Sequence, residues 1–506
     1  MRFFNRPAQI AVLAVVALYF LVWPVWRIPF PMEIAPIEGW CAYFADAAGG
    51  ADFLYPRPGQ LIVDNYPPLS FYLLGYGEKL FGDALYLGRI LSLLATLGTG
   101  ALIYRVVRQL GASRGPAAVA GVWFIAVMAD SFYRYVGVND PQMVAEAGMV
   151  AALSWFLARD RAGKSAEPAI LLMVLAGFYK HNTVVIPATV LIWLLLRDGR
   201  KALRPAAVGI GAALAGLLLC VAFFGHDFVS NMLTPRPYSL ARAWAGAGRL
   251  QWILPALIVW AVWAIPARRD SLARFLMLYI GIGLLTYLVQ WTGGDVLDSA
   301  QLDLVIASAI GLGIAFERGG TLRFVRRLGE ERMRALVVFV LVLRLAATSH
   351  AEPLLLLTDA AYRAEFPANA DVTRAAAARI ATLPGRIACG NKLVCRMAGK
   401  PFLFDDFRAD MILQTEAPPR TTTADLIRQH GLIYVNDDPR TSTDFLDRWF
   451  HFPRRANTSL DSSFSWRSKI PQTASLDRPR ERPSDARPLP LWSESRTGRI
   501  ARSLHP

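Results

Sequence analysis

The sequence predicts a mainly α-helical protein, in which a polytopic bundle of about eleven membrane-spanning helices precedes a small extracytoplasmic α/β domain. Of the 506 residues, 54% are hydrophobic and only 18% are charged, whereas soluble proteins carry about 25% charged residues. The mean hydropathy is +0.33, and long apolar runs recur through the first two-thirds of the chain and then stop. These observations exclude an ordinary soluble enzyme, a disordered chain, collagen and a coiled coil.

Eleven segments read as spans, each of which needs about 20 mainly apolar residues, or slightly fewer in the arms of a hairpin. They are residues 8–30, 84–104, 115–133, 142–158, 167–180, 182–196, 205–224, 250–266, 272–291, 302–316 and 335–348. The first segment has no small-residue cleavage site after a short apolar core, so we expect a retained signal-anchor helix.

The distribution of charge predicts the orientation. A net charge of +15 would suggest nucleic-acid binding in a soluble protein. Here, however, the basic residues cluster in every second gap between the predicted spans, as at 105–114, 197–204 and 318–334. Such gaps are cytoplasmic by the positive-inside rule. The alternate gaps, rich in acids, aromatics, Gly and Pro, then face outward, and an odd number of spans places the C-terminal part outside.

Three regions follow along the chain. Residues 1–349 form the transmembrane domain, with a long first outward loop at 31–83. Residues 350–453 form an α/β domain, in which we expect strands at RIACG and KPFLF around a helix at NKLVCRMAG, then a capped helix, a Gly stop and a strand in TTTADLIRQHGLIYVND. Residues 454–506 form a basic tail without periodicity, which predicts disorder.

The sequence permits either a disulfide or free thiols at Cys389 and Cys395. Cys389 and Cys395 both lie on the oxidising side of the predicted topology, which permits a local disulfide. Against a disulfide, Cys389 lies in a predicted strand, and a free cysteine is often simply buried. Cys41 and Cys220 have no evident partner.

A family resemblance appears after the first span, in IEGWCAYFADAAGGADFLYPRPGQLIVDNYPPLSFYLLG, and again in VGVNDPQM, FYKHNTVVIPATVLIWLLL and GGDVLDSAQLDL. With these motifs the chain resembles the GT-C superfamily of polyprenyl-phosphate-sugar-dependent membrane glycosyltransferases, the relatives of protein mannosyltransferases and of the aminoarabinose transferase of lipid A. The family's first loop often begins with Asp-Glu, whereas here Ile37 precedes Glu38.

The resemblance implies a bacterial inner-membrane enzyme that moves a sugar from a polyprenyl-phosphate donor to a lipid, glycan or protein acceptor outside the cell membrane, with inversion at the anomeric carbon. It implies membrane lipid and the donor as partners and no nucleic acid. It leaves the sugar, the oligomeric state and a divalent metal open, and names no certain cofactor.

Such a transfer needs a base for the acceptor hydroxyl, and a carboxylate in a partly desolvated site suits it. Glu38 is the first choice, against a solvated loop residue or a helix N-terminal charge. Asp46, eight residues on, falls on nearly the same helical face and either supports Glu38 or covers the wet side of an interfacial helix. Asp140 either shapes the acceptor site or caps a helix.

The departing polyprenyl phosphate needs cations beside it. Lys180 and His181, at the tip of a predicted outward hairpin, are the leading pair, although a lysine there could also snorkel to the headgroups. Weaker candidates for the donor phosphate are Arg57, Lys79, Arg89 and Arg236, for which interfacial anchoring is the alternative.

Further residues are expected at the cavity wall. Tyr66, Asn139 and Asp295 are the candidates, with an interfacial aromatic belt as the alternative for Tyr66. Pro67 and Pro68 fix the entry of a membrane-surface helix. We see no Cys/His spacing for a metal, no phosphate-binding glycine loop and no catalytic serine triad that fits the topology.

The competing function is a polytopic transporter or lipid flippase, since many carriers also combine eleven or so spans with intramembrane polar residues. No internal repeat supports it. A third reading, in which the spans only anchor a functional soluble domain, does not account for polar residues in several separate outward loops.

Overall fold

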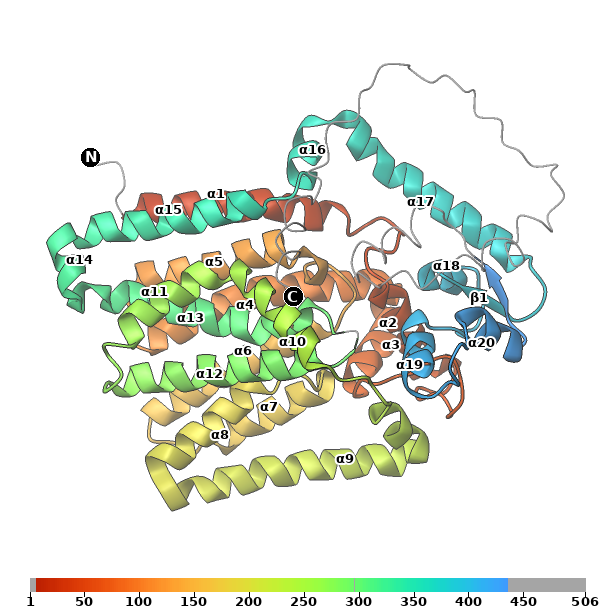
Figure 1. Ribbon diagram of the computed structural model, residues 1–506, viewed down its shortest axis with the longest axis horizontal. Helices are drawn as coiled ribbons and strands as arrows, with labels where there is room; N and C mark the ends of the chain where they lie inside the picture. Colours follow the sequence, from red (N-terminus) through yellow and green to blue (C-terminus); the bar gives the residue numbers. More distant parts are fainter. Residues whose placement is uncertain (1–5, 295, 436–506) are drawn as a thin grey trace, which may run out of the picture. The chain divides into compact units, whose positions relative to one another are not determined.

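The computed structural model describes residues 6–294 and 296–435, all within one compact unit. Helices dominate it (Figure 1). Eleven α-helices coincide with the eleven predicted segments: α1 (Arg6–Trp26), α4 (Ala84–Gln109), α5 (Arg114–Ser131), α6 (Gln142–Arg161), α7 (Glu167–Tyr179), α8 (Val185–Asp198), α9 (Leu203–Met232), α11 (Leu254–Ala264), α12 (Ser271–Thr292), α13 (Leu302–Arg318) and α15 (Glu330–Thr348). The short helices α10 (Leu240–Ala247) and α14 (Arg323–Leu328) were not predicted.

Fewer of these helices pass as spans than the sequence suggests. Among the described residues, five helical stretches are long and apolar enough to cross a membrane, or seven if each of two bent helix pairs counts as one. The bends measure 83° before α11 and 80° after α15. The chain is a multi-pass membrane protein, but eleven spans are not confirmed, because helices such as α7, with 13 residues, fall short of the length a span needs.

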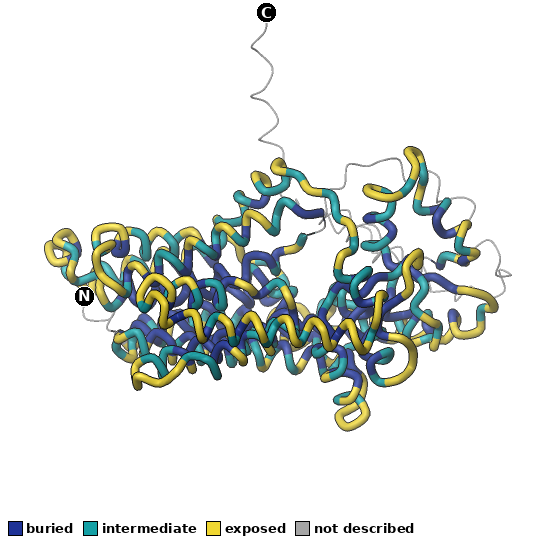
Figure 2. Tube along the Cα trace, turned by 90° about the horizontal axis from the view of Figure 1, so that it is seen from below, coloured by how far each residue is buried: buried dark blue, intermediate teal, exposed yellow. Residues whose placement is uncertain are grey.

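Helix α13 is central to the bundle. Every residue from Leu302 to Phe316 is buried, and the helix packs against α4, α5, α11 and α12. An apolar helix without a polar face belongs in such a surrounded position. Exposed residues lie instead along the outer helices (Figure 2). In the stretch Val185–Met232 only 11% of the most apolar window is buried, as expected of a surface that faces lipid.

The first loop folds into two helices at one end of the bundle (Figure 1). Helix α2 (Ile37–Asp46) continues into a π-helical turn at Ala47–Ala51, and α3 (Leu69–Phe81) follows after an irregular stretch. Helix α3 begins directly after Pro68, its N-cap. The expected helix entry after the Pro-Pro pair is therefore confirmed.

The C-terminal segment is small and mixed. It contains α16 (Glu352–Thr358), α17 (Ala360–Ala381), β1 (Ile387–Cys389), α18 (Lys392–Met397), α19 (Asp406–Thr415), α20 (Thr423–Gln429) and β2 (Ile433–Val435). Strand β1 pairs in parallel with β2, with Ile387 opposite Ile433. Helix α20 begins with the capping box formed by Thr422 and Asp425, as the sequence suggests. The predicted tail, residues 454–506, lies outside the described residues.

One expected strand is wrong. Residues 400–404, KPFLF, form no strand. Phe402 stacks instead on Tyr43 of α2, with the ring centroids 4.7 Å apart, and the Tyr43 hydroxyl donates to the carbonyl of Lys400 at 2.9 Å. The apolar run is buried against the first loop rather than in a sheet.

Two of the four cysteines form a disulfide. A disulfide joins Cys389 at the end of β1 to Cys395 in α18. Cys41 and Cys220 are free and buried.

The first loop is bound to the C-terminal segment at a second place. Leu61 belongs to a buried cluster with Ala388 and Phe404, and its carbonyl accepts from the backbone N–H of Asp405 at 2.8 Å. The predicted boundary near residue 350 thus falls inside one packed unit.

Candidate active site

Glu38 lies in the first turn of α2, where an acidic side chain favours the helix N-terminus. It is fully buried and forms a bidentate ion pair with Arg89 of α4: Oε1 accepts from Nε at 2.7 Å, and Oε2 accepts from Nη2 at 2.6 Å. Each oxygen also accepts from one backbone N–H, Oε1 from Asn139 at 3.0 Å and Oε2 from Ile34 at 2.7 Å. The carboxylate therefore has four donors and no exposed surface.

Arg89 is equally enclosed. Besides Glu38, its guanidinium donates to the carbonyls of Ile28, Phe30 and Met32, at 3.0, 2.7 and 2.6 Å. These carbonyls belong to the segment that joins α1 to α2. The Glu38–Arg89 pair thus fixes the course of the chain after the first helix, and the Arg89 guanidinium is occupied by Glu38 and these carbonyls.

A second ion pair lies next to the first. Asp140 Oδ1 accepts from Lys180 Nζ at 2.8 Å and from the backbone N–H of Gln142 at 2.8 Å. Asp140 therefore both supports the start of α6 and pairs with Lys180. The Asp140 and Lys180 side chains are 7% and 4% exposed. Such burial rules out a snorkelling lysine.

Tyr66 covers this second pair. The Lys180 ammonium lies 4.3 Å from the centroid of the Tyr66 ring, a cation–π distance, and the His181 ring lies 6.0 Å from it. Burial is the main cause that raises the pKa of Tyr66, so its hydroxyl stays neutral at physiological pH. The sequence-predicted residues Asp140, Lys180, His181 and Tyr66 are therefore brought together.

The two ion pairs form one network, because Asn139 and Asp140 are consecutive. The backbone N–H of Asn139 binds Glu38, whereas the Asp140 side chain binds Lys180. Gly88 of α4 permits this close approach: a Cβ at position 88 would lie 1.9 Å from Asn139 Oδ1. We call Glu38, Arg89, Asn139, Asp140 and Lys180 the acidic-basic network.

Other predicted residues lie outside this network. Asp46 pairs with Arg396 of the C-terminal segment, at 2.7 Å, and does not contact Glu38. Lys79 donates to the carbonyl of Gly49 at 2.6 Å, and Arg57 is exposed on the first loop. Arg236 lies over the ring of Phe407, 5.3 Å from its centroid.

Asp295 lies outside the described residues, so its proposed place at the cavity wall stays a prediction. Its neighbour Asp298 forms an ion pair with Arg249.

Sequence reasoning gave too little weight to three buried acidic residues. Asp64 of the first loop is fully buried; its Oδ1 accepts from the N–H of Tyr66, and Oδ2 has no partner among the described residues. Burial raises the pKa of Asp64 well above its usual value, opposed by that hydrogen bond. Glu146 of α6 and Asp303 of α13 also lie buried in the bundle, where Glu146 Oε1 accepts from Gln142 Nε2 at 2.8 Å. An apolar run interrupted by single acids at 146 and 303 is the signal that could have found this pair.

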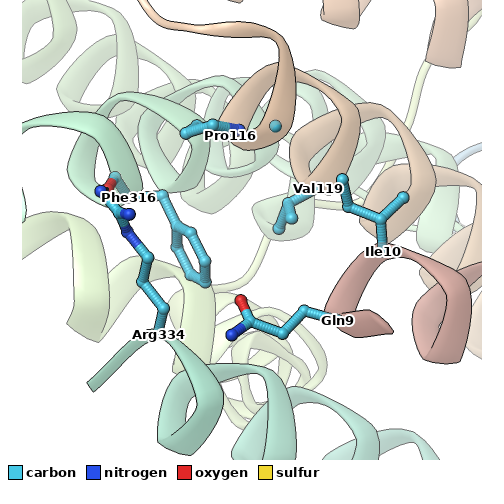
Figure 3. A pocket seen from close by; sticks show the side chains of 7 residues that line it. Gln9, Ile10, Pro116, Val119, Phe316 and Arg334 are labelled. Atoms are coloured by element: carbon cyan, nitrogen blue, oxygen red, sulfur yellow. The ribbon is translucent and has the colours of Figure 1, made fainter. Parts of the chain in front are cut away.

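No metal-ligand cluster is found in the described part of the chain, and a small cavity lies within the helical bundle. Among residues 6–294 and 296–435, no group of three or more His, Cys, Asp or Glu side chains is arranged to hold a metal ion. A cavity between α1, α5, α13 and α15 is lined by residues that include Gln9, Phe316 and Arg334 (Figure 3). Its volume of about 10 Å³ holds at most one water molecule.

Comparisons with known proteins find a matching family for part of the chain and a solved structure of similar fold. Residues 65–226 match the family described as dolichyl-phosphate-mannose-protein mannosyltransferase. The chain resembles the crystal structure of ArnT from Cupriavidus metallidurans bound to undecaprenyl phosphate, with a TM-score of 0.53 and 15% identity, over 79% of this chain and 87% of that chain. AglB, the archaeal oligosaccharyltransferase of Archaeoglobus fulgidus, in complex with an inhibitory peptide and a dolichol-phosphate, gives a TM-score of 0.48 and 12% identity, over 80% of this chain and 64% of that chain. No curated protein sequence matches the chain.

Proposed function

We propose that this chain is a GT-C glycosyltransferase that uses a polyprenyl-phosphate sugar, in line with the family match over residues 65–226 and the similar fold. It transfers a sugar from that donor to a lipid, glycan or protein acceptor on the outer side of the bacterial inner membrane. The observation that carries the proposal is the buried Asp140–Lys180 pair beneath Tyr66. It joins a base and a cation, the two groups that the reaction needs. The alternation of basic clusters along the chain supports the outward orientation.

We propose Asp140, rather than Glu38, as the base. All four hydrogen bonds to Glu38 would have to rearrange before it could take a proton. Both hydrogen bonds to Asp140 go to Oδ1, so Oδ2 is without a hydrogen bond among the described residues. A general base needs such an open oxygen within reach of the acceptor hydroxyl.

In the proposed reaction, Asp140 takes up the proton and Lys180 stabilises the leaving phosphate. The acceptor oxygen forms a bond to the anomeric carbon and gives its proton to Asp140, while the bond from that carbon to the phosphate oxygen breaks. The polyprenyl phosphate gains a negative charge as it leaves. Because Asp140 becomes neutral in the same step, Lys180 loses its counter-charge when the phosphate gains one, and this favours the transition state over the ground state.

Glu38, Arg89 and Asn139 hold this arrangement in place. They join α2, α4 and the loop before α6, the elements that lie around Asp140. His181, which lies beside Tyr66, is our candidate for a hydrogen bond to the donor phosphate. Arg57, Lys79 and Arg236 have no geometry here that favours donor contact.

The test uses the full chain in vesicles with a polyprenyl-phosphate sugar and an extract of outer-leaflet glycolipids. Asp140→Asn keeps the shape of the side chain and removes the base, so we expect the transfer rate to fall by about 10²- to 10⁴-fold, with polyprenyl-phosphate binding retained. Asp160→Asn, at the other end of α6 in an exposed pair with Arg197, is the matched control. Unchanged transfer by Asp140→Asn would exclude it as the base.

Mass spectrometry of surface glycolipids and glycoproteins from a deletion strain tests the function as a whole. We expect one glycan species to lack a terminal sugar. Translocation of a labelled lipid by the purified protein with no change to its glycan would instead support the transporter alternative.

A further inference from the structure

Arg396 of α18 faces three carboxylates of the first loop. It forms a bidentate pair with Asp46, in which Nε and Nη2 each lie 2.7 Å from a carboxylate oxygen. Its Nη1 lies 2.8 Å from an oxygen of Asp83, and Nη2 lies 3.4 Å from Glu78. The Arg396 side chain is only 11% exposed, whereas Asp46 and Asp83 are 28% and 42% exposed, so the guanidinium is shielded from water more than its partners are.

The three carboxylates mark the ends of three helices. Asp46 ends α2, Glu78 lies near the end of α3, and Asp83 caps the start of α4, where it accepts from the N–H of Leu85. Helices α2 and α4 are the two that carry Glu38 and Arg89. Asp46 lies eight residues beyond Glu38, and Asp83 lies six residues before Arg89. Helices α2 and α4 are therefore joined twice: by the Glu38–Arg89 pair, and by Arg396 at a distance of about 12 Å along α2 and about 9 Å along α4.

The cluster around Arg396 has an excess of negative charge. One guanidinium stands against three carboxylates, and burial, followed by the nearby Asp46, raises the pKa of Glu78. Without Arg396 these carboxylates would repel one another and separate the ends of α2, α3 and α4. The cation is thus what allows the three helices to meet.

Helix α18 is itself held firmly against α2. Its Cys395 forms the disulfide with Cys389, and Lys392 is buried with Asp405, Nζ to Oδ1 being 3.2 Å. At Gly39 of α2 a Cβ would lie 2.5 Å from the backbone nitrogen of Leu393. The disulfide and the Lys392–Asp405 pair therefore fix α18 within the C-terminal segment, and the close approach at Gly39 packs α18 against α2.

We propose that Arg396 is a positioning residue of the active site: it sets the placement of α2 against α4, and through the Glu38–Arg89 pair the placement of Asn139 and Asp140. The inference rests on the proposed function and deepens it. The C-terminal segment takes part in building the catalytic site, in addition to any contact with an acceptor.

The experiment compares three substitutions in the full chain. Arg396→Gln removes the charge, Arg396→Lys keeps it without the bidentate geometry, and the double variant Arg396→Gln/Asp46→Asn removes the guanidinium together with its main repelling partner, so that folding is retained. Arg408→Gln is the matched control. Arg408 is also 11% exposed and bidentate, with Glu416, but that pair lies within the C-terminal segment.

We expect the double variant to bind polyprenyl phosphate with full stoichiometry and near-normal affinity, and to lose kcat on the order of 100-fold, since an error of about 1 Å in a catalytic group has that effect. Arg396→Lys should fall between this variant and the wild type. Arg408→Gln should keep its kcat. A folding defect would instead lower binding stoichiometry and kcat in equal proportion.

Hydrogen exchange gives a readout independent of the reaction. We expect faster amide exchange over 37–46 and 83–90 in the double variant and not in Arg408→Gln. If exchange and kcat both stay at wild-type values, Arg396 does not position the site. If exchange rises while the wild type itself transfers no sugar, the proposed function fails and the positioning stands.

Discussion

Replacement of Glu38 by Gln tests whether the Glu38–Arg89 pair is a scaffold or the reactive centre. The substitution keeps the shape of the side chain and removes its charge. In either orientation the new amide group points two of its own hydrogens at donors. In one orientation these donors are Arg89 Nε and the N–H of Asn139; in the other they are Arg89 Nη2 and the N–H of Ile34. Two buried donors therefore lose their acceptor.

The free-energy cost follows from this geometry. A buried donor without an acceptor costs about 1–3 kcal/mol, so two cost about 2–6 kcal/mol, in line with about 3–5 kcal/mol for a broken buried ion pair. Arg89 keeps its three carbonyl acceptors, which places the expected loss near the lower end, at about 3 kcal/mol. We expect the free energy of unfolding to fall by that amount.

The assay is denaturant unfolding in detergent micelles, combined with a double-mutant cycle of Glu38→Gln and Arg89→Gln. We expect a coupling energy of about 2–3 kcal/mol. We also expect the molecules of Glu38→Gln that still bind polyprenyl phosphate to keep most of their transfer rate. Wild-type stability with complete loss of transfer would refute this reasoning and make Glu38 the base.

Two further predictions concern close packing and the disulfide. Gly88→Ala should destabilise the protein by about 1–3 kcal/mol, because its Cβ would meet Asn139 Oδ1. Gly98→Ala on the same helix, where a Cβ meets no atom within 4 Å, should be neutral or stabilising by up to about 1 kcal/mol. Equal unfolding curves for the two variants would contradict this packing. Cys389→Ala/Cys395→Ala should lower the free energy of unfolding by about 2 kcal/mol, the loop-entropy contribution of a bridge over six residues. The same variant should show faster amide exchange in residues 392–397. A melting temperature that is the same under reducing and oxidising conditions would show that the bridge contributes nothing to stability.

The helices were predictable because their signal is local. Apolar runs of adequate length, and the Pro67-Pro68 pair before α3, depend only on residues a few positions apart. The same holds for the capping box of α20 and for the proximity of Asp140 to a helix start. The strand expected at 400–404 failed because the aromatic partner of Phe402 is Tyr43, which a local pattern does not reveal.

The site was predictable in its residue types and less so in its pairing. Chemistry led to Glu38, Asp140 and Lys180, and the structure joins them in one network. No local pattern indicates that Arg89 pairs with Glu38, 51 positions away, or that Arg396 pairs with Asp46, 350 positions away. Neither Arg89 nor Arg396 lies in a distinctive sequence motif, and only the fold brings each of them close to its carboxylate.

The contact between Asp46 and Arg396 also has a consequence for biosynthesis. Ribosomes add about 5–20 residues per second, so the 350 positions between these partners correspond to a delay of about 20–70 s. During that interval α2 and α4 have already been made, while Arg396 has not. A nascent chain, or one truncated before Arg396, would therefore lack the cation that joins these helices, and under the proposed function its site would be complete only after the C-terminal segment has folded against the first loop.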